Sequence, residues 1–406
     1  MRIALATEGS RGDVHPMLAL GSRLRAAGHE VRLCAPPDFA AEARARGLAF
    51  CAVGGAVRDY LVAHAGALTR GLRSQVAAAG RYLSESCDAQ FASLPEATAG
   101  CERIVAASLS FAAASCAELH GAHYRFVAYC PVLIRSAEHP SFLVPVQSLP
   151  RWMNRVSWSL TERPLGAFLR RLINRGRRRL GLDPIEDAWR HVSGAPAILA
   201  ADRALAPAPA DAPQPVRQIP CLHDMRPAPL PAKLEDFLAA GPAPIYFGFG
   251  SMPDPDPVAT TRIVLDAASQ VGARALISAG WAGLGEGPLP EGVAVVGTTS
   301  HAALFPRVAA VVHHGGAGTT TTAARAGAPQ LVVPHLADQF YWGRRVEILG
   351  LGPPPIRRTA LTAERLAEAL DAVVGNETLA ERAADFGSRS RAVADEIDPV
   401  VAVISD

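Results

Sequence analysis

Apolar residues in this chain follow two alternating patterns. Short runs rich in Val, Ile, Leu and Ala predict strands buried on both faces, and the stretches between them carry apolar residues at helical spacing. The runs fall at residues 3–6, 31–34, 49–53, 104–107, 125–129, 197–200, 244–252 with its turn, 275–278, 293–296, 308–312 and 330–333. Because strands and helices alternate, the pattern predicts an α/β protein with doubly wound parallel sheets.

Prolines interrupt this pattern at short intervals between residues 207 and 231, which predicts a linker. A chain of 406 residues is long enough for two α/β domains, each with its own core. We therefore place one domain at residues 1–220 and a second at 221–385, followed by a C-terminal helix at 386–406.

The clearest candidate site follows the predicted strand 308–312. The next residues, 313–319, read HHGGAGT and lead into a helical pattern. Glycines let the backbone approach a ligand, and Thr319 to Thr322 and the free N–H groups of the first helical turn supply donors. The helix dipole adds about half a positive charge, and His314 can hydrogen-bond or carry more. A diphosphate fits this turn, held by His314, Gly316, Gly318 and Thr319.

A second polar element follows the next predicted strand, 330–333. Pro334 opens a loop that ends in Asp338 and Gln339, before a helix predicted at 340–349. In open parallel sheets ligands bind at the carboxyl ends of strands, so a diphosphate at one turn and a polyhydroxyl group at the next form one site. A nucleotide-sugar satisfies both. Asp338 can also cap the helix that follows it.

These motifs carry a family resemblance. HHGGAGT, PHLADQ and the opening residues 6–39, ATEGSRGDVHPMLALGSRLRAAGHEVRLCAPPDF, together resemble a family 1 glycosyltransferase of the GT-B fold. They are similar to the bacterial branch that decorates antibiotics and sterol-like or polyketide aglycones. The resemblance implies two Rossmann-like domains facing across a cleft, an acceptor-binding domain at 1–220, a donor-binding domain at 221–385, and a last helix that crosses back onto the first domain.

Inverting glycosyl transfer needs a base that takes the proton from the acceptor hydroxyl. Asp13 matches the acidic residue of the family's RGD-x-x-P opening and is our candidate base. Plant relatives place a histidine there with a distant aspartate, whereas this chain has Ser108 near the expected partner position, so Asp13 would act alone. His15 is the rival base, and helix N-capping is the alternative role for Asp13.

The resemblance extends to further donor contacts. Arg11 can support the diphosphate or hold its own loop, and Ser251 offers a hydroxyl after the strand and turn at 244–252. We expect the nucleobase beside the loop 297–301, with Trp281 as a wall. Uracil and thymine differ by one methyl group, worth about 1 kcal/mol, so both UDP and dTDP donors fit. The expected contacts are Ser10, Arg11 and Ser251 for the diphosphate, and Trp281, Thr298 and Thr299 for the base.

One short motif suggests a metal. Asp254-Pro255-Asp256 resembles the metal-binding DxD of another glycosyltransferase fold, but it stands in a Pro-rich loop without a supporting histidine or third carboxylate. We interpret it as a solvated loop. A helix N-terminus and His314 can neutralise a diphosphate, so we expect no metal and no cofactor beyond the sugar nucleotide as co-substrate.

Two regions of the first domain bear on the acceptor. Residues 53–82 are the least regular part, and we expect acceptor contacts there. Residues 151–190 are rich in Arg with Trp and Phe interleaved, which fits either a helix lying on an anionic membrane or a long helix that exposes its arginines and packs its aromatic residues on the domain. Acidic residues dilute the charge, so we expect packing on the domain.

The composition narrows the class of protein. A formal net charge of +2 gives no reason to expect a nucleic-acid partner. The seven cysteines are odd in number and form no CxxC pair, which predicts reduced core thiols. The chain enters its first strand without a secretory signal, and its apolar run at 104–117 is too short for a bilayer. These features predict a cytoplasmic enzyme.

We therefore expect an inverting transferase that moves a hexose from UDP or dTDP to a hydroxyl of a hydrophobic small molecule. A GT-B nucleotide-sugar epimerase is an alternative, and it would need extra acidic residues around the second carbon of the donor sugar. A catalytically silent auxiliary homologue is another, and it would not need to retain Asp13, His314, Asp338 and Gln339.

Overall fold

The computed structural model describes residues 1–57, 72–252, 254–394 and 399–405. The acceptor contacts expected at 53–82 fall in part on residues 58–71, which lie outside the described residues.

The first half of the chain forms a seven-stranded parallel sheet in the order β3-β2-β1-β4-β5-β6-β7. Leu5 at its centre pairs with Leu33 on one side and Val105 on the other, and all three are fully buried. Helices cover both faces, which explains why these strands are almost continuously apolar. The strands are β1 Arg2–Glu8, β2 Glu30–Ala35, β3 Ala49–Ala52, β4 Arg103–Ser108, β5 His123–Ala128, β6 Ala197–Ala200 and β7 Val216–Ile219.

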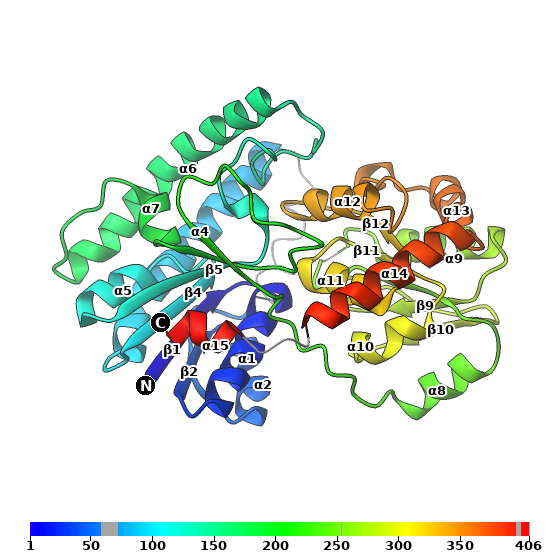
Figure 1. Ribbon diagram of the computed structural model, residues 1–406, viewed down its shortest axis with the longest axis horizontal. Coiled ribbons are helices and arrows are strands. Elements are labelled where there is room, and N and C mark those ends of the chain that lie inside the picture. Colours follow the sequence, from blue (N-terminus) through cyan, green and yellow to red (C-terminus); the bar gives the residue numbers. More distant parts are fainter. Residues whose placement is uncertain (58–71, 253, 395–398, 406) are drawn as a thin grey trace.

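The helices of this half lie on both faces of the sheet (Figure 1). They are α1 Arg11–Ala26, α2 Ala40–Ala45, α4 Leu72–Ala97, α5 Ala113–His120, α6 Arg151–Arg179 and α7 Ala188–Ser193, with short 3-10 turns at Pro37–Phe39 and Pro131–Leu133. The last helix, α15 Pro399–Ser405, also belongs here. It packs against α1 and β7, and its Val400 and Ile404 join the core around Leu5.

The second half forms a five-stranded parallel sheet in the order β10-β9-β8-β11-β12. Its strands are β8 Ile245–Gly248, β9 Ala275–Ser278, β10 Val293–Val296, β11 Ala310–His313 and β12 Gln330–Val332. Its helices are α8 Ala232–Ala239, α9 Pro257–Gln270, α10 His301–Leu304, α11 Ala317–Ala326, α12 Gln339–Ile348, α13 Ala363–Asp371 and α14 Glu377–Ala394, with 3-10 turns at Phe305–Arg307 and Arg358–Ala360. The predicted α/β class with doubly wound parallel sheets is confirmed.

One local expectation was wrong. Strand β7 lies inside the predicted linker, where its flanking Pro215 and Pro220 suit an edge strand, because an edge needs fewer backbone donors. Helix α1 begins at Arg11 and has Pro16 inside it. Arg11 and Asp13 therefore lie in its first turn.

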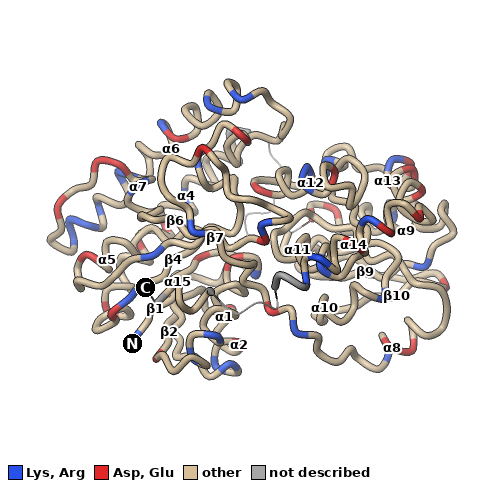
Figure 2. The backbone as a smooth tube through the Cα atoms, in the orientation of Figure 1, with Lys and Arg blue, Asp and Glu red and all other residues tan. Residues whose placement is uncertain are grey.

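Helix α6 combines buried and exposed aromatic residues. Trp158 is buried, and Trp189 of α7 packs against the hydrophobic core that includes Leu169 and Ile173 of α6, as expected. The packing expectation was wrong for Trp152 and Leu160, whose exposed fractions are 64% and 71%. Acidic and basic residues are mixed over both halves (Figure 2). No helix in the described part of the chain has the length and apolar character needed to cross a membrane.

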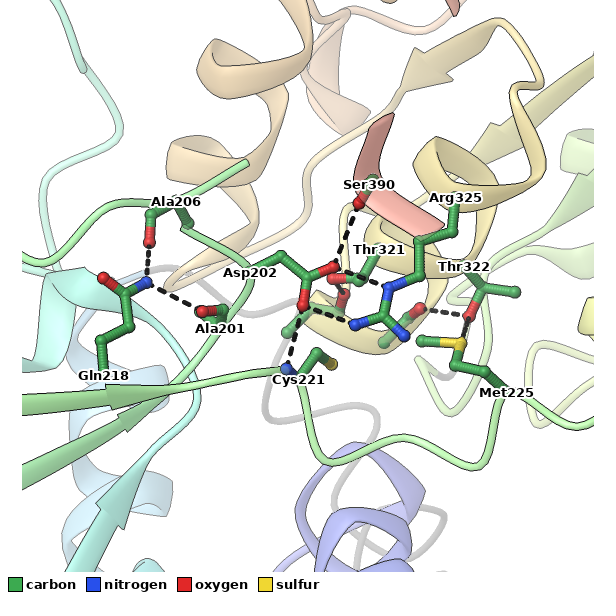
Figure 3. Close-up of polar contacts among 12 residues, drawn as sticks. Ala201, Asp202, Ala206, Gln218, Cys221, Met225, Thr321, Thr322, Arg325 and Ser390 are labelled. Carbon is green, nitrogen blue, oxygen red and sulfur yellow. Dashed lines mark hydrogen bonds and ion pairs between the residues drawn. The ribbon is translucent and has the colours of Figure 1, made fainter. Parts of the chain in front are cut away.

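An ion pair joins the two halves (Figure 3). Asp202 follows β6, and Arg325 lies in the last turn of α11; the arginine Nε and Nη2 donate to the two carboxylate oxygens at 2.7 and 2.6 Å. The Cys221 N–H also donates to Asp202 Oδ1 at 3.0 Å, and Ser390 Oγ of α14 lies 3.5 Å from Oδ2. Both charged side chains are largely buried, with exposed fractions of 12% and 9% for Arg325 and Asp202.

We expect Arg325→Ala to lower the free energy of unfolding by about 3 kcal/mol, because removal of one member leaves the other charge buried without its partner. Chemical denaturation followed by circular dichroism measures this. The control is Arg389→Ala, since the Arg389 and Asp385 pair is exposed on both sides and its loss should cost less than about 1 kcal/mol. Equal effects of the two substitutions would contradict a stabilising role for the buried pair.

Candidate active site

The turn after β11 is in direct contact with the start of α12. Gly315 has a φ of +89°, and a Cβ placed on it would come within 2.8 Å of Val332 Cγ1 and 2.9 Å of the Gln339 carbonyl oxygen. Any side chain at this position would be strained and would push the two turns apart. The structure therefore brings together the two elements that the sequence assigned to a diphosphate and a sugar.

His314 lies between two glycine turns. A Cβ on Gly250 would come within 2.8 Å of His314 Cε1, and one on Gly316 within 2.5 Å of its Nε2. Ser251 follows Gly250, whose carbonyl oxygen accepts a hydrogen bond from the Trp281 N–H at 3.0 Å. Two glycine turns, one of which leads into Ser251, thus meet around one imidazole. Burial lowers the pKa of His314 to about 3, so the ring is neutral and can serve as a hydrogen-bond donor.

Helix α11 presents free N–H groups beside His314. Gly316 is its N-cap, and Gly318 and Thr319 lie in its first turn. The expectation that the whole run Thr319 to Thr322 supplies donors was wrong. The hydroxyls of Thr320, Thr321 and Thr322 donate to carbonyl oxygens of the preceding turn at 2.7 to 2.9 Å.

Asp338 and Gln339 begin helix α12. Asp338 occupies the N-cap position, but its carboxylate makes no capping bond and instead accepts from Trp342 Nε1 at 3.0 Å. Burial, opposed by the Trp342 hydrogen bond and assisted by the charge of Asp13, raises the pKa of Asp338 to about 6. Gln339 Oε1 accepts from the N–H groups of His335 and Leu336 at 2.8 and 3.1 Å, so this oxygen holds its own loop.

Asp13 lies at the start of α1, close enough for its charge to affect Asp338 in the other half. Ser10 is the N-cap, and its N–H donates to Asp13 Oδ2 at 2.8 Å in a capping box. Asp13 is therefore a helix cap in the structure, at the third helical position rather than at the N-cap. Its pKa is raised by burial and lowered by hydrogen bonds from Ser108 and Ser10, which confirms that Ser108 is its neighbour.

His15 points towards another element. Its Nε2 lies 3.2 Å from Glu42 Oε2, and its ring packs edge-on against Phe39 with centroids 6.1 Å apart. This ion pair lowers the pKa of Glu42. His15 thus already has an acidic partner on α2, whereas Asp13 has no basic partner among the residues that the structure describes. Arg11 occupies the first helical position and is partly exposed.

The expected nucleobase loop follows β10. Thr298 and Thr299 precede Ser300, which caps α10 by accepting from the Ala303 N–H at 3.4 Å. Thr299 Oγ1 is buried and has no hydrogen-bond partner among the described residues. His301 is a packing residue, since it stacks on Phe305 with ring centroids 4.5 Å apart.

Glu8 is a functional candidate that the sequence analysis missed. It ends β1, its exposed fraction is 3%, and its Oε1 accepts from Tyr82 OH at 2.9 Å. Oε2 is buried and has no partner within the described part of the chain. Burial, opposed by this hydrogen bond and assisted by the charge of Asp13, raises the pKa of Glu8 to about 7. The sequence signal that could have identified Glu8 is an acidic residue at the end of an apolar strand.

The interpretation of Asp254 as part of a solvated loop was wrong. Its side chain is 1% exposed, and Arg358 Nη2 and Nε donate to Oδ2 at 2.9 and 3.2 Å. Thr260 Oγ1 donates to Oδ1 at 3.0 Å. These bonds give Asp254 the role of anchoring the loop. The described residues contain no group of three His, Cys, Asp or Glu side chains placed to hold a metal ion.

Comparison with known families agrees with this geometry. Residues 3–120 match the glycosyltransferase family 28 N-terminal domain, and residues 262–399 match the C-terminal domain described as erythromycin biosynthesis protein CIII-like.

Comparison with individual proteins points to the same family. The chain is 36% identical to the vancomycin aglycone glucosyltransferase of Amycolatopsis orientalis, over 87% of this chain and 85% of that protein. It is 33% identical to the sterol 3-beta-glucosyltransferase UGT80B1 of Arabidopsis thaliana, over 91% of this chain and 62% of that one. The solved structure of glycosyltransferase VinC in complex with dTDP has the same fold, with a TM-score of 0.68 at 22% identity and full coverage of both chains. The chain therefore belongs to the GT-B glycosyltransferases, in the family that includes the vancomycin and sterol glucosyltransferases.

Proposed function

We propose that this enzyme moves a hexose, with inversion, from a UDP- or dTDP-sugar to a hydroxyl of a hydrophobic natural-product acceptor. The observation that carries the proposal is the contact between the HHGGAGT turn and the Asp338 loop, made through Gly315. The relatives named for vancomycin aglycone and sterols support a hydrophobic acceptor. In this proposal residues 1–220 bind the acceptor, residues 221–385 bind the donor, and residues 386–406 connect back to the first domain.

The proposed donor site is assembled from five turns of the second half. The N–H groups of the first turn of α11 and the neutral His314 would hold the diphosphate, since a helix N-terminus favours an anion. Ser251 follows Gly250, which packs against His314, and Ser10 and Arg11 lie at the start of α1 in the other half. Trp281 and the loop with Thr298 and Thr299 would enclose the base. The Asp338 carboxylate and the Gln339 amide nitrogen would bind the sugar hydroxyls, because Gln339 Oε1 is already used.

The proposed chemistry is a single displacement. Asp13 takes the proton of the acceptor hydroxyl, the oxygen forms a bond to the anomeric carbon, and the bond from that carbon to the diphosphate breaks. The nucleoside diphosphate leaves with the electron pair and is stabilised by His314 and the α11 N–H groups. One Asp13 oxygen holds the Ser10 N–H, and the carboxylate retains lone pairs for the proton.

Simple assays would distinguish two alternative functions from this one. A nucleotide-sugar epimerase would change its donor without any acceptor. A silent auxiliary homologue would neither bind a nucleotide nor transfer sugar. The presence of Asp13 and Asp338 within electrostatic reach of each other favours transfer, because a base and a sugar-binding carboxylate belong at the same reaction centre.

UDP or dTDP should stabilise the protein selectively over GDP and ADP. At about a hundred times its dissociation constant, a nucleotide adds roughly 2.7 kcal/mol of stability, which thermal unfolding detects. His314→Ala should reduce this response, because it removes a donor and opens a cavity between the glycine turns. If the wild type responds to none of the four nucleotides, the proposed donor site is wrong.

Asp13→Asn should reduce the rate of transfer by roughly 10² to 10⁴ while leaving UDP or dTDP affinity unchanged. Asparagine still accepts the Ser10 N–H, so the substitution separates the base from the helix cap. Burial raises the pKa of Asp13, so the wild-type rate should also fall at acidic pH as the carboxyl becomes protonated.

The control is Asp256→Asn, which alters an exposed aspartate that caps α9. It should leave transfer unchanged. Unaltered transfer by Asp13→Asn would end the assignment of the base, and transfer lost only in His15→Ala would move the assignment to the rival histidine.

Excess EDTA should leave the transfer rate unchanged. Arg358 and Thr260 already occupy the Asp254 carboxylate, and the α11 N–H groups and His314 supply donors for the diphosphate. Initial rates measured with EDTA and with added Mg²⁺ test this. A loss of activity in EDTA that Mg²⁺ restores would show that a metal takes part.

A further inference from the structure

His223 lies in the segment that leads from β7 to α8, and its ring packs on the first turn of α11. A Cβ placed on Gly318 would come within 2.5 Å of His223 Cε1, 2.7 Å of Nδ1 and 2.9 Å of Nε2. The imidazole therefore occupies the space of a side chain at position 318. Side-chain bonds in a helix tilt towards its N-terminus, so this space lies at the rim where the free N–H groups of α11 begin.

The residues around His223 are fixed to both halves of the molecule. The Cys221 N–H donates to Asp202, and Thr322 Oγ1 of α11 lies 3.4 Å from the sulfur of Met225 (Figure 3). Asp224 forms ion pairs with Arg46 at 3.4 Å and with Arg226 at 3.0 Å. The backbone on either side of His223 is thus held in place, and the position of the ring follows from these contacts.

The ring itself has an unused polar atom. His223 Nδ1 is buried and makes no hydrogen bond with the residues that the structure describes. On its other side the ring faces His15, with centroids 6.4 Å apart. Burial, with the neighbouring charge of His15, lowers the pKa of His223 to about 4, so the ring is neutral with one N–H donor. A buried polar atom without a partner is costly unless a ligand supplies one.

We propose that His223 is an additional diphosphate-binding residue, which donates a hydrogen bond to the leaving diphosphate at the N-terminus of α11. The inference rests on the proposed function, because it places the sugar nucleotide at this helix. It also gives Gly318 a specific role, since any larger residue would displace the imidazole from the helix terminus. A linker residue then contributes to donor binding from between the two halves.

The test compares wild type with His223→Phe, which keeps a ring but has no donor, and His223→Gln, which keeps a donor. Calorimetry measures binding of UDP and dTDP and, separately, of uridine and thymidine. The Phe variant should bind the diphosphates at least about tenfold more weakly than the wild type, because hydrogen bonds to charged groups are stronger than those between neutral groups. The Gln variant should recover part of this loss, and nucleoside affinity should be the same in all three proteins.

The matched control is His123→Phe, at the exposed amino end of β5, which should bind every ligand as the wild type does. If His223→Phe does not fold, His223→Leu takes its place in the test, because leucine also lacks a hydrogen-bond donor. Unchanged diphosphate affinity, or an equal loss for diphosphates and nucleosides, would overturn the role of His223. If His223→Phe gives either result while His314→Ala still weakens nucleotide binding, the proposed function stands and only the role of His223 is wrong. A wild type that binds no nucleotide would instead overturn the function itself.

Discussion

The carboxylate of Asp202 sets the relation between the two halves of this enzyme. Asp202 follows strand β6 of the first sheet, and its oxygens bind Arg325, the Cys221 N–H and the Ser390 hydroxyl. Arg325 is in the last turn of the helix whose first turn forms the proposed diphosphate site. Because a helix is rigid over ten residues, fixing its C-terminal end also fixes the direction in which its N-terminus faces the first half. The position of Asp13 relative to the proposed donor site therefore depends on a contact at the other end of this helix.

At the proposed site itself, close packing around glycines also fixes how the turns lie relative to one another. His314 fits between Gly250 and Gly316, and the backbone at Gly315 touches the start of α12. These contacts leave no room for side chains, so the turns after three strands converge without flexible groups between them. Donors fixed in this way need little reorganisation when the diphosphate charge develops, which is the condition under which hydrogen bonds contribute most to catalysis.

The sequence could predict the features that depend on local pattern. Apolar runs located the strands, and the glycine motif located the turn before α11, because both are properties of neighbouring residues. The sequence could not predict which distant segments are in contact. Nothing near Asp254 in the sequence indicates Arg358, and nothing near His223 indicates Gly318. Strand β7 was missed for a related reason, since flanking prolines are typical of a linker and are tolerated only because this strand lies at an edge.

The two roles of Asp13, as helix cap in the structure and as proposed base, illustrate why the local pattern left its function open. A cap needs a charged or polar oxygen near free N–H groups, and a base needs a carboxylate whose pKa is high enough to hold a proton. The bond from Ser10 favours the charged form, while burial disfavours it, and burial is the larger effect. The hydrogen bond therefore orients the carboxylate without removing its basicity. Glu8, which is buried with a pKa of about 7, is a second acidic group near the same helix start, and the charge of Asp13 makes it a better proton acceptor.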